Sequence, residues 1–521
     1  MGFTLPTSSH LTNRAFIVVS ATCAAVGAGI IVWATPWGIG LSPDSAVYIA
    51  GARSLGELKG YMQPADGTTF SPIVHYPPAY PASLAVLRVI GLDPFAAARC
   101  LNTVLFSVNA VLAGYLLFAV TRRWEWAAAS AALMITAFPL VQVHTMVWSE
   151  PLFILLELCA WLFLLHYSRS LSLCNLICAG LAAGLAALTR YAGVAVILTG
   201  VLALIALIRT EWKRRIICVA LFFLFSMLPV ILWMGRNWLV AGSATNRTVA
   251  IHVIDFERIV GIFRTILSWL VGDLISAVPP ALILCLAAGL GTWFALQVRK
   301  REFASARSET DYLRQSMLLF TFCYLFVLFF SISVLDDQTP IDSRILAPMY
   351  PVLLLFGFAL VANSHGESRA PEMKLSASWA IVLLLVVLQA FQSWPWLYYV
   401  HSEGVGYASR TWRESNLLLQ VKELAPSTII YSNAPDVLYI LAGRIAYMLP
   451  RKTRPDTREP NSQFSAQIDE MAAQLKNSRG AIVYFDQVRW RRYLPNGKEL
   501  EGMLALRPLQ RVSDGTIYTL E

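Results

Sequence analysis

Long apolar stretches recur along this 521-residue chain and restrict what it can fold into. A helix that crosses a bilayer needs about 20 predominantly apolar residues, because its backbone finds no water in the hydrocarbon core. Hydrophobic residues make up 57% of the chain and charged residues only 14%, whereas about a quarter of a soluble domain is charged. The sequence therefore predicts an all-α polytopic membrane domain with about 11 transmembrane helices. We place them near residues 15–34, 99–120, 126–142, 150–167, 174–189, 192–208, 216–238, 279–298, 315–334, 345–362 and 377–396.

Positive charges orient these spans. The basic clusters at 122–123, 213–215 and 299–301 lie in short loops that fall on one side of the membrane under this count. The positive-inside rule makes that side the cytoplasm. The N-terminus is then cytoplasmic, and loop 35–98 and everything after residue 397 are external. The net charge of +9 follows mainly from the inner loops, so we expect no nucleic acid partner.

Two apolar stretches affect the count. Residues 262–277 carry Arg264 and Asp273, and counting them as a span would move the cluster at 299–301 outside. We therefore expect an interfacial or re-entrant helix there, on the external face. The alternative for the first span is a cleaved signal peptide, but its apolar run is long and lacks a clear cleavage site.

The end of the chain has a different periodicity. Three short apolar runs are typical of buried strands, at 428–432, 481–485 and 516–520. Three stretches have helical spacing, at 410–424, 435–442 and 463–477. We therefore predict two domains, a membrane domain over residues 1–397 and a small external α/β domain over residues 398–521.

The first external loop contains several side chains suited to chemistry. Asp44 could act as a general base or help to hold a divalent metal ion, although Ser-Pro-Asp-Ser is also good turn chemistry. Tyr48 follows in the same loop, and His75, Tyr76 and Tyr80 lie in a rigid run of Tyr and Pro further on. These four side chains are candidates to position a substrate or its phosphate.

Two acids mark the fourth span. Glu150 begins it, in Trp148-Ser149-Glu150-Pro151. Capping by Ser149 and an acid at the positive end of the helix dipole would explain this run without any chemistry. Glu157 lies seven residues on and nearly on the same helical face. An acid inside a span is costly and is a functional-site hypothesis by default, with an interhelical hydrogen bond as the alternative.

Three arginines lie at external helix ends: Arg190, Arg236 and Arg344. Guanidinium groups bind phosphate oxygens in pairs, so the set would suit a lipid-linked phosphate. Each arginine alone is equally explained as an anchor at the membrane interface.

Three histidines could contribute to a metal site. His75, His144 and His252 are also predicted to be external, but they lack the spacing of metal ligands. A divalent metal ion would need the fold to gather them, or would use Asp44, Glu150 and His75. The sequence has no Walker motif and no nucleotide-binding glycine loop, so a nucleotide has nothing to hold it.

Five short motifs follow one another along the membrane domain: Asp44-Ser-Ala-x-Tyr48, Tyr76-Pro-Pro-x-Tyr80-Pro, Ser149-Glu150-Pro-Leu, Leu188-Thr-Arg190 and Ser343-Arg344-x-Leu-x-Pro348. In order and sidedness they resemble the membrane glycosyltransferases of GT-C fold, in particular the branch of the protein O-mannosyltransferases and the lipid A aminoarabinose transferase. The similarity covers most of residues 10–397. The tail also resembles the small external domain of some bacterial members.

This resemblance implies an enzyme of a bacterial inner membrane. It would take a sugar from a polyprenyl-phosphate carrier and attach it, with inversion, to a glycan, lipid or protein acceptor on the external face. Asp44 matches the first-loop catalytic acid of the family and Glu150 its second-loop acid. Arg190 and Arg344, with Arg236 and Tyr76, would then bind the donor phosphate.

The sequence also departs from the family pattern. Where the aminoarabinose branch reads Glu-Lys-Pro-Pro, this chain has His75 and Tyr76 before its two prolines, and the tandem Asp-Glu of the O-mannosyltransferases is absent. A lipid-carrier transporter or a polysaccharide polymerase is the alternative function. A transporter predicts inverted repeats and paired charges near the midplane, but no repeat is visible and Glu157 is the one obvious deep charge. A third alternative is a membrane-anchored protein that binds a ligand through its tail.

Overall fold

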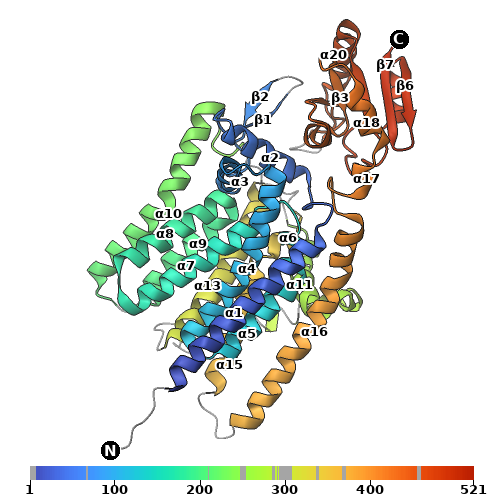
Figure 1. Ribbon diagram of the computed structural model, residues 1–521. Helices are drawn as coiled ribbons and strands as arrows, with labels where there is room; N and C mark the ends of the chain where they lie inside the picture. Colours follow the sequence, from blue (N-terminus) through green and yellow to red (C-terminus); the bar gives the residue numbers. More distant parts are fainter. Residues whose placement is uncertain are drawn as a thin grey trace, which may run out of the picture. The chain divides into compact units, whose positions relative to one another are not determined.

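The computed structural model in Figure 1 describes residues 7–65, 69–208, 210–246, 254–283, 308–335, 340–365, 371–454 and 459–521, with the single positions 251, 285, 288, 289 and 292. The chain divides into two compact units. The helical unit comprises Met1–Pro36, Val74–Tyr80 and Ala96–Ser402. The mixed unit comprises Trp37–Ile73, Pro81–Phe95 and Glu403–Glu521.

Long apolar helices build the helical unit. Among the described residues, 6 helices are long and apolar enough to cross a membrane. They belong to α1 (Thr7–Ala34), α4 (Pro94–Thr121), α7 (Glu150–Ser170), α10 (Trp212–Ala241), α13 (Glu309–Val334) and α16 (Pro371–Glu403). Shorter apolar helices are α8 (Leu173–Thr189), α9 (Val194–Ala206) and α15 (Met349–His365). The protein is therefore a multi-pass membrane protein.

Ten of the eleven predicted spans fall on helical segments, but only six of the ten contain a helix that is long and apolar enough to cross a membrane, so the count of eleven is not confirmed. The predicted span at 279–298 lies largely outside the described residues. The predicted span 126–142 is two helices, α5 (Trp124–Thr136) and α6 (Phe138–His144), bent by 61°. Pro139 lies in the first turn of α6, where its missing N–H costs nothing. The break turns the chain toward the segment before α7.

Small residues let α8 pack closely against its neighbour. A Cβ atom at Gly184 would lie 2.5 Å from the carbonyl oxygen of Ser226 in α10, and one at Gly180 would lie 3.0 Å from that of Phe222. Close backbone approach of this kind is typical of helix pairs in lipid. The packing fixes α8, and with it the residue that follows its last turn, Arg190.

The predicted interfacial segment at 262–277 is helical but begins earlier. It forms α11 (Phe256–Val271), followed by a 3-10 turn, η2 (Gly272–Ala277). A short helix, α14 (Ser343–Leu346), contacts α11.

The tail forms the predicted α/β domain. Its sheet has the strand order β4-β3-β5-β7-β6, in which β3 is parallel to β4 and β5, and β7 is antiparallel to β5 and β6. The strands are β3 (Ile430–Ser432), β4 (Tyr447–Met448), β5 (Ala481–Phe485), β6 (Leu506–Val512) and β7 (Gly515–Leu520). The helices are α17 (Arg410–Arg413), α18 (Asn416–Glu423), α19 (Pro435–Val437), the π-helical turn η4 (Leu438–Ala442), α20 (Phe464–Ser478) and α21 (Gly497–Met503). Our prediction missed β4, which is only two residues long, and β6, whose residues are mostly exposed.

The mixed unit also contains part of the first loop. This part forms α2 (Pro43–Gly56), β1 (Met62–Pro64), β2 (Phe70–Pro72) and most of α3 (Ala79–Val89). The backbone of Leu41 pairs with the tail, since Tyr407 N donates to its carbonyl at 2.9 Å. A Cβ atom at Gly406 would lie 1.8 Å from the same oxygen, so only glycine fits there. The tail and the first loop thus form one body, which our sequence-based division at residue 397 did not anticipate.

Candidate functional site

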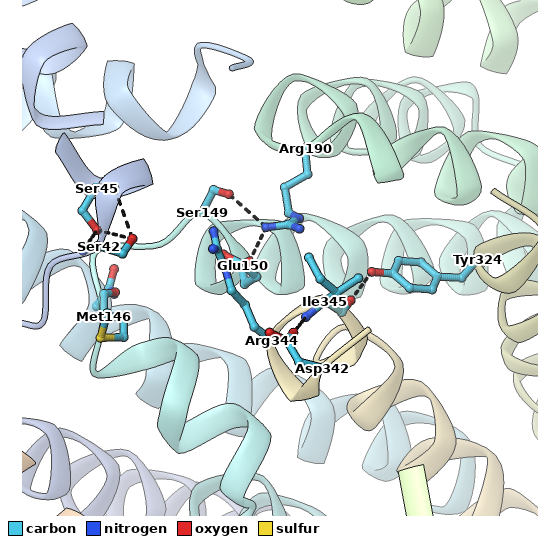
Figure 2. Close-up of polar contacts among 11 residues, drawn as sticks. Ser42, Ser45, Met146, Ser149, Glu150, Arg190, Tyr324, Asp342, Arg344 and Ile345 are labelled. Atoms are coloured by element: carbon cyan, nitrogen blue, oxygen red, sulfur yellow. Dashed lines mark hydrogen bonds and ion pairs between the residues drawn. The ribbon is translucent and has the colours of Figure 1, made fainter. Parts of the chain in front are cut away.

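A buried cluster of charged side chains lies at the start of α7 (Figure 2). Glu150 is the first residue of α7 and is fully buried. Its Oε1 atom pairs with the guanidinium groups of both Arg190 and Arg344, the second at 2.6 Å from Nε. The two arginine side chains are only 15% and 17% exposed. One carboxylate between two guanidinium groups leaves a net positive charge, which in a partly buried site favours an anion.

Breaks between helices position both arginines. Arg190 follows the last turn of α8 with an extended backbone, at φ −150° and ψ 136°. The chain then makes a 3-10 turn, η1 (Tyr191–Gly193), before α9 begins. The Nη1 atom of Arg190 also donates to Ser149 Oγ at 3.5 Å. The charge of Arg190 therefore sits at the junction of α7, α8 and α9.

Arg344 is held by the short helix α14. Asp342 caps this helix, because its Oδ1 atom accepts a hydrogen bond from Ile345 N at 3.0 Å. Tyr324 of α13 donates from its hydroxyl to the carbonyl of Ile345 at 2.5 Å. The guanidinium of Arg344 lies 4.2 Å from the centre of the Trp148 ring. Cap, tyrosine and ring together fix the direction of the arginine.

Two buried asparagines of α4 hold the chain on the two sides of Glu150. Asn102 donates from Nδ2 to the carbonyls of Met146 at 2.6 Å and His144 at 3.3 Å, and its Oδ1 accepts from Tyr80 Oη at 3.2 Å. Asn109 donates to the carbonyl of Pro151 at 3.0 Å. Our sequence analysis missed both residues. A sequence feature could have pointed to them: they are two amide side chains, seven residues apart, inside an apolar span. Polar side chains in such a span must find hydrogen-bond partners within the protein.

This arrangement revises one expectation. Ser149 does not cap α7: its backbone is helical and its side chain makes no capping hydrogen bond. His144, which we predicted to lie on the external side, is fully buried within the protein on α6, between Leu140 O and the Asn109 amide. Within the described part of the chain no three His, Cys, Asp or Glu side chains gather as a metal site would need, and His252 lies outside that part.

Glu157 lies two turns deeper in α7 and is fully buried. Its carboxylate lies beside Trp161, one turn further along the same helix. Among the described residues we find no interhelical hydrogen bond of the kind that we considered as the alternative explanation. Burial of an acid with so few polar contacts is costly.

Arg236 belongs to a second polar group. Its guanidinium lies 5.1 Å from the centre of the Trp233 ring and donates to Asn237 Oδ1 at 3.0 Å. The Asn237 amide and the Tyr191 hydroxyl both donate to the carbonyl of Val74, each at 3.3 Å. The structure thus holds residue 74, just before His75 and Tyr76, beside the residue that follows Arg190. The rings of His75 and Tyr76 meet edge to face at 5.1 Å.

Asp44 and Tyr48 lie on α2, in the mixed unit. The residue that caps this helix is Ser42. Its Oγ accepts from Ser45 N at 3.4 Å, and Ser45 Oγ accepts from Ser42 N at 2.9 Å (Figure 2). Asp44 is half-buried in the first turn, and Tyr48 is buried. Ser42, and not Asp44, therefore caps α2.

The arrangement of helices is the GT-C fold of membrane glycosyltransferases, as the sequence motifs predicted. One solved structure with this fold is ArnT from Cupriavidus metallidurans bound to undecaprenyl phosphate, with a TM-score of 0.54 and 13% identity over 96% of this chain and 97% of ArnT.

Two larger proteins share the fold. The archaeal oligosaccharyltransferase AglB from Archaeoglobus fulgidus, solved with an inhibitory peptide and a dolichol-phosphate, matches with a TM-score of 0.53 and 12% identity over 89% of this chain and 69% of AglB. The mycobacterial arabinofuranosyltransferase AftD matches with a TM-score of 0.52 and 12% identity over 96% of this chain and 41% of AftD. The sequence matches no protein-family model and no curated protein.

A substitution at Asn102 tests whether its hydrogen bonds hold the segment before Glu150 in place. Replacing Asn102 by Ala is expected to lower the free energy of unfolding by about 1–2 kcal/mol, because two carbonyls and the Tyr80 hydroxyl each lose one hydrogen bond. Activity should fall further than stability alone explains, since the segment before Glu150 is loosened. Thermal unfolding of the detergent-solubilised protein measures the first effect. Asn175→Ala, which removes an exposed hydrogen bond to Ser170, is the control. Equal effects of the two changes would contradict this role of Asn102.

Proposed function

We propose that this protein is a membrane glycosyltransferase that moves a sugar from a polyprenyl-phosphate donor to an acceptor on the external face, with inversion at the sugar carbon. The observation that carries the proposal is the buried cluster of Arg190, Glu150 and Arg344. Proteins of the same fold solved with undecaprenyl phosphate and dolichol-phosphate support the class of donor. We place the protein in a bacterial inner membrane with its N-terminus in the cytoplasm.

The charges of the cluster suit this donor. A sugar linked to a lipid through one phosphate is a monoanion, and it would neutralise the net positive charge left by two arginines and one glutamate. When the sugar departs, the lipid phosphate becomes a monoester that carries about −1.5 to −2 charges. Guanidinium groups already fixed in place stabilise such developing charge without reorganising. We therefore assign Arg190 and Arg344 to the donor phosphate, and Glu150 to orienting them.

An apolar groove offers a place for the lipid tail. A pocket of about 380 Å³ lies between α5, α11, α15 and α16 and is lined almost wholly by apolar and aromatic side chains. Trp269 in its wall donates from Nε1 to Ser343 Oγ at 3.3 Å. Ser343 immediately precedes Arg344. A polyprenyl chain in this groove would thus leave its phosphate near the cluster.

We assign the acceptor side of the reaction to Asp44. Its carboxylate would position or deprotonate the acceptor hydroxyl that attacks the sugar carbon as the phosphate leaves from the opposite face. Asp44 lies half-buried in the first turn of α2, next to the Ser42 cap. His75, Tyr76 and Arg236 would then complete the donor site, and a divalent metal ion held by Asp44 stays an alternative use of that carboxylate.

Direct measurement of transfer tests the proposal. Purified protein is incubated with a panel of radiolabelled polyprenyl-phosphate sugars and a membrane extract that contains acceptors. We expect label to move from the lipid fraction into acceptor with at least one donor, and no transfer from the matching nucleotide sugars. Movement of the intact lipid-linked sugar across vesicles, without cleavage, would instead show a lipid-carrier transporter.

The proposed orientation makes a separate prediction. A reporter that is active only outside the cytoplasm, fused after Glu521, should be active, and the same reporter fused at Arg301 should be silent. Positive charge in the inner loops is the reason. Reporter activity in intact cells, normalised to the amount of fusion protein, is the measurement. The opposite pattern would reverse the orientation and remove the external site.

A further inference from the structure

The mixed unit contains a cleft of about 1440 Å³ that the proposed reaction does not use. One wall is formed by α2 and β1 of the first loop, and the other by β4, η4 and α20 of the tail. Pockets that hold one drug-sized molecule measure roughly 300–1,000 Å³. The cleft is therefore large enough for a ligand built from several linked units.

Aromatic rings and amides are fixed together at one wall of this cleft. Tyr431 and Tyr447 stack with their ring centres 4.7 Å apart and their planes inclined by 16°. Gln474 joins them, because its Oε1 accepts from Tyr431 Oη at 2.5 Å and its Nε2 donates to Tyr447 Oη at 3.2 Å. All three residues line the cleft. Tyr431 is buried in the core of the tail and Tyr447 is half-buried against it, so the group offers the cleft the outer part of the Tyr447 ring beside groups that both donate and accept hydrogen bonds.

A second amide group lies further along the cleft. Asn461 donates from Nδ2 to Gln467 Oε1 at 3.0 Å and to the carbonyl of Arg451 at 2.8 Å. These contacts fix both amides before any ligand arrives, which reduces the entropy that binding must overcome.

Four charged side chains line the cleft: Asp436, Glu470, Arg451 and Arg454. Asp436 is already paired with Arg491 at 2.7 Å, which leaves one acid, Glu470, beside two bases. The fixed amides make the wall unsuitable for a lipid chain. The wall suits a polar ligand that is rich in hydrogen-bonding groups, and these groups do not require the ligand to be charged.

An unusual turn lies in the same wall. The π-helical turn η4 (Leu438–Ala442) carries Tyr439 on the cleft and ends at Gly443, whose φ is +66°. Turns of this kind are rare and are found frequently at functional sites. The guanidinium of Arg53, from α2, lies 5.4 Å from the centre of the Tyr439 ring and helps to fix it.

We propose that this cleft binds a neutral oligosaccharide, the glycan part of the acceptor. The C–H faces of sugar rings pack on aromatic rings, and sugar hydroxyls form hydrogen bonds with amides. An oligosaccharide can therefore bind both the tyrosine group and the Asn461–Gln467 pair. The role as acceptor site rests on the proposed glycosyltransferase function, whereas binding of the oligosaccharide does not. A peptide laid along strand β4 would use backbone hydrogen bonds instead and is the competing outcome.

A blocking substitution tests the proposal. Ala473 lies on α20, lines the cleft and is exposed, so Ala473→Trp fills the cleft without disturbing the core. Ser465→Trp adds the same ring to an exposed position of α20 that does not line the cleft. Full-length protein in detergent is titrated with neutral hexasaccharides of glucose, mannose, galactose or arabinose, and binding is followed by calorimetry or saturation-transfer NMR.

We expect at least one hexasaccharide to bind, Ala473→Trp to weaken it by at least about tenfold, and Ser465→Trp to leave the dissociation constant unchanged. Tyr447→Leu, which keeps apolar volume but removes the ring, should also weaken binding. Failure of every hexasaccharide to bind, equal binding by the blocked variant, or displacement of the sugar by an unstructured Ser/Thr-rich peptide would overturn the proposal. Because the readout is binding, a failure of sugar transfer in the separate assay leaves this result unaffected.

Discussion

Replacing Asp44 by Asn is expected to lower sugar transfer by roughly 10²-fold or more while leaving donor binding intact. Asn is nearly isosteric with Asp but carries no negative charge, so it neither accepts a proton from the acceptor hydroxyl nor stabilises the charge that builds up on it. Turnover is measured with saturating lipid donor, and donor affinity separately by displacement of labelled polyprenyl phosphate.

The neighbouring cap provides the control for Asp44. Ser42→Ala removes the side chain that accepts from Ser45 N and should destabilise α2 by about 0.5–2 kcal/mol. Asp44→Asn should leave thermal stability close to that of the unaltered protein, because Ser42 keeps the cap. Loss of turnover in both variants in proportion to lost stability would reduce Asp44 to a structural residue. Full turnover in Asp44→Asn would reject the proposed base.

Arg344→Ala should weaken donor binding by roughly 10–100-fold, the range expected for loss of a hydrogen bond to a charged group. Arg190→Ala should act in the same direction. The donor affinity of Arg344→Lys should lie between those of the unaltered protein and Arg344→Ala, because lysine keeps the charge and loses the planar pair of donors. Affinity for polyprenyl phosphate in detergent micelles is the measurement.

The opposite end of α7 offers a matched control for these arginines. Arg169 pairs with Glu309 at 2.5 Å, so Arg169→Ala breaks an ion pair on the same helix without touching the cluster. Donor affinity should not change in this variant. Glu150→Gln should weaken donor binding and also stability, because two partly buried guanidinium groups lose their shared partner. Donor affinity that is equal in Arg344→Ala and the Arg169→Ala control would show that Arg344 is only an interface anchor.

Much of the fold could be predicted because its signals are local. An apolar run long enough to cross a bilayer must form a helix, whatever surrounds it, since no other backbone structure of one segment satisfies its own hydrogen bonds in lipid. The strands at 481–485 and 516–520 were visible for a similar reason, as their residues are buried and apolar. The break at Pro139 inside a predicted span was missed, because one proline in an apolar run does not say whether a helix kinks or ends.

The same distinction between local and long-range signals applies to the candidate site. The sequence alone indicated that Glu150, Arg190 and Arg344 stand at helix ends, because each adjoins an apolar run. Only the tertiary structure decided that they meet: Arg344 lies 194 positions from Glu150, and the packing of α14 against its neighbours brings the two together. The structure likewise decided that Asn102 and Asn109 hold the chain on the two sides of Glu150, and that the tail encloses a cleft with the first loop. Periodicity and apolar length are properties of neighbours in sequence, whereas ion pairs and hydrogen bonds form between side chains that only packing places side by side.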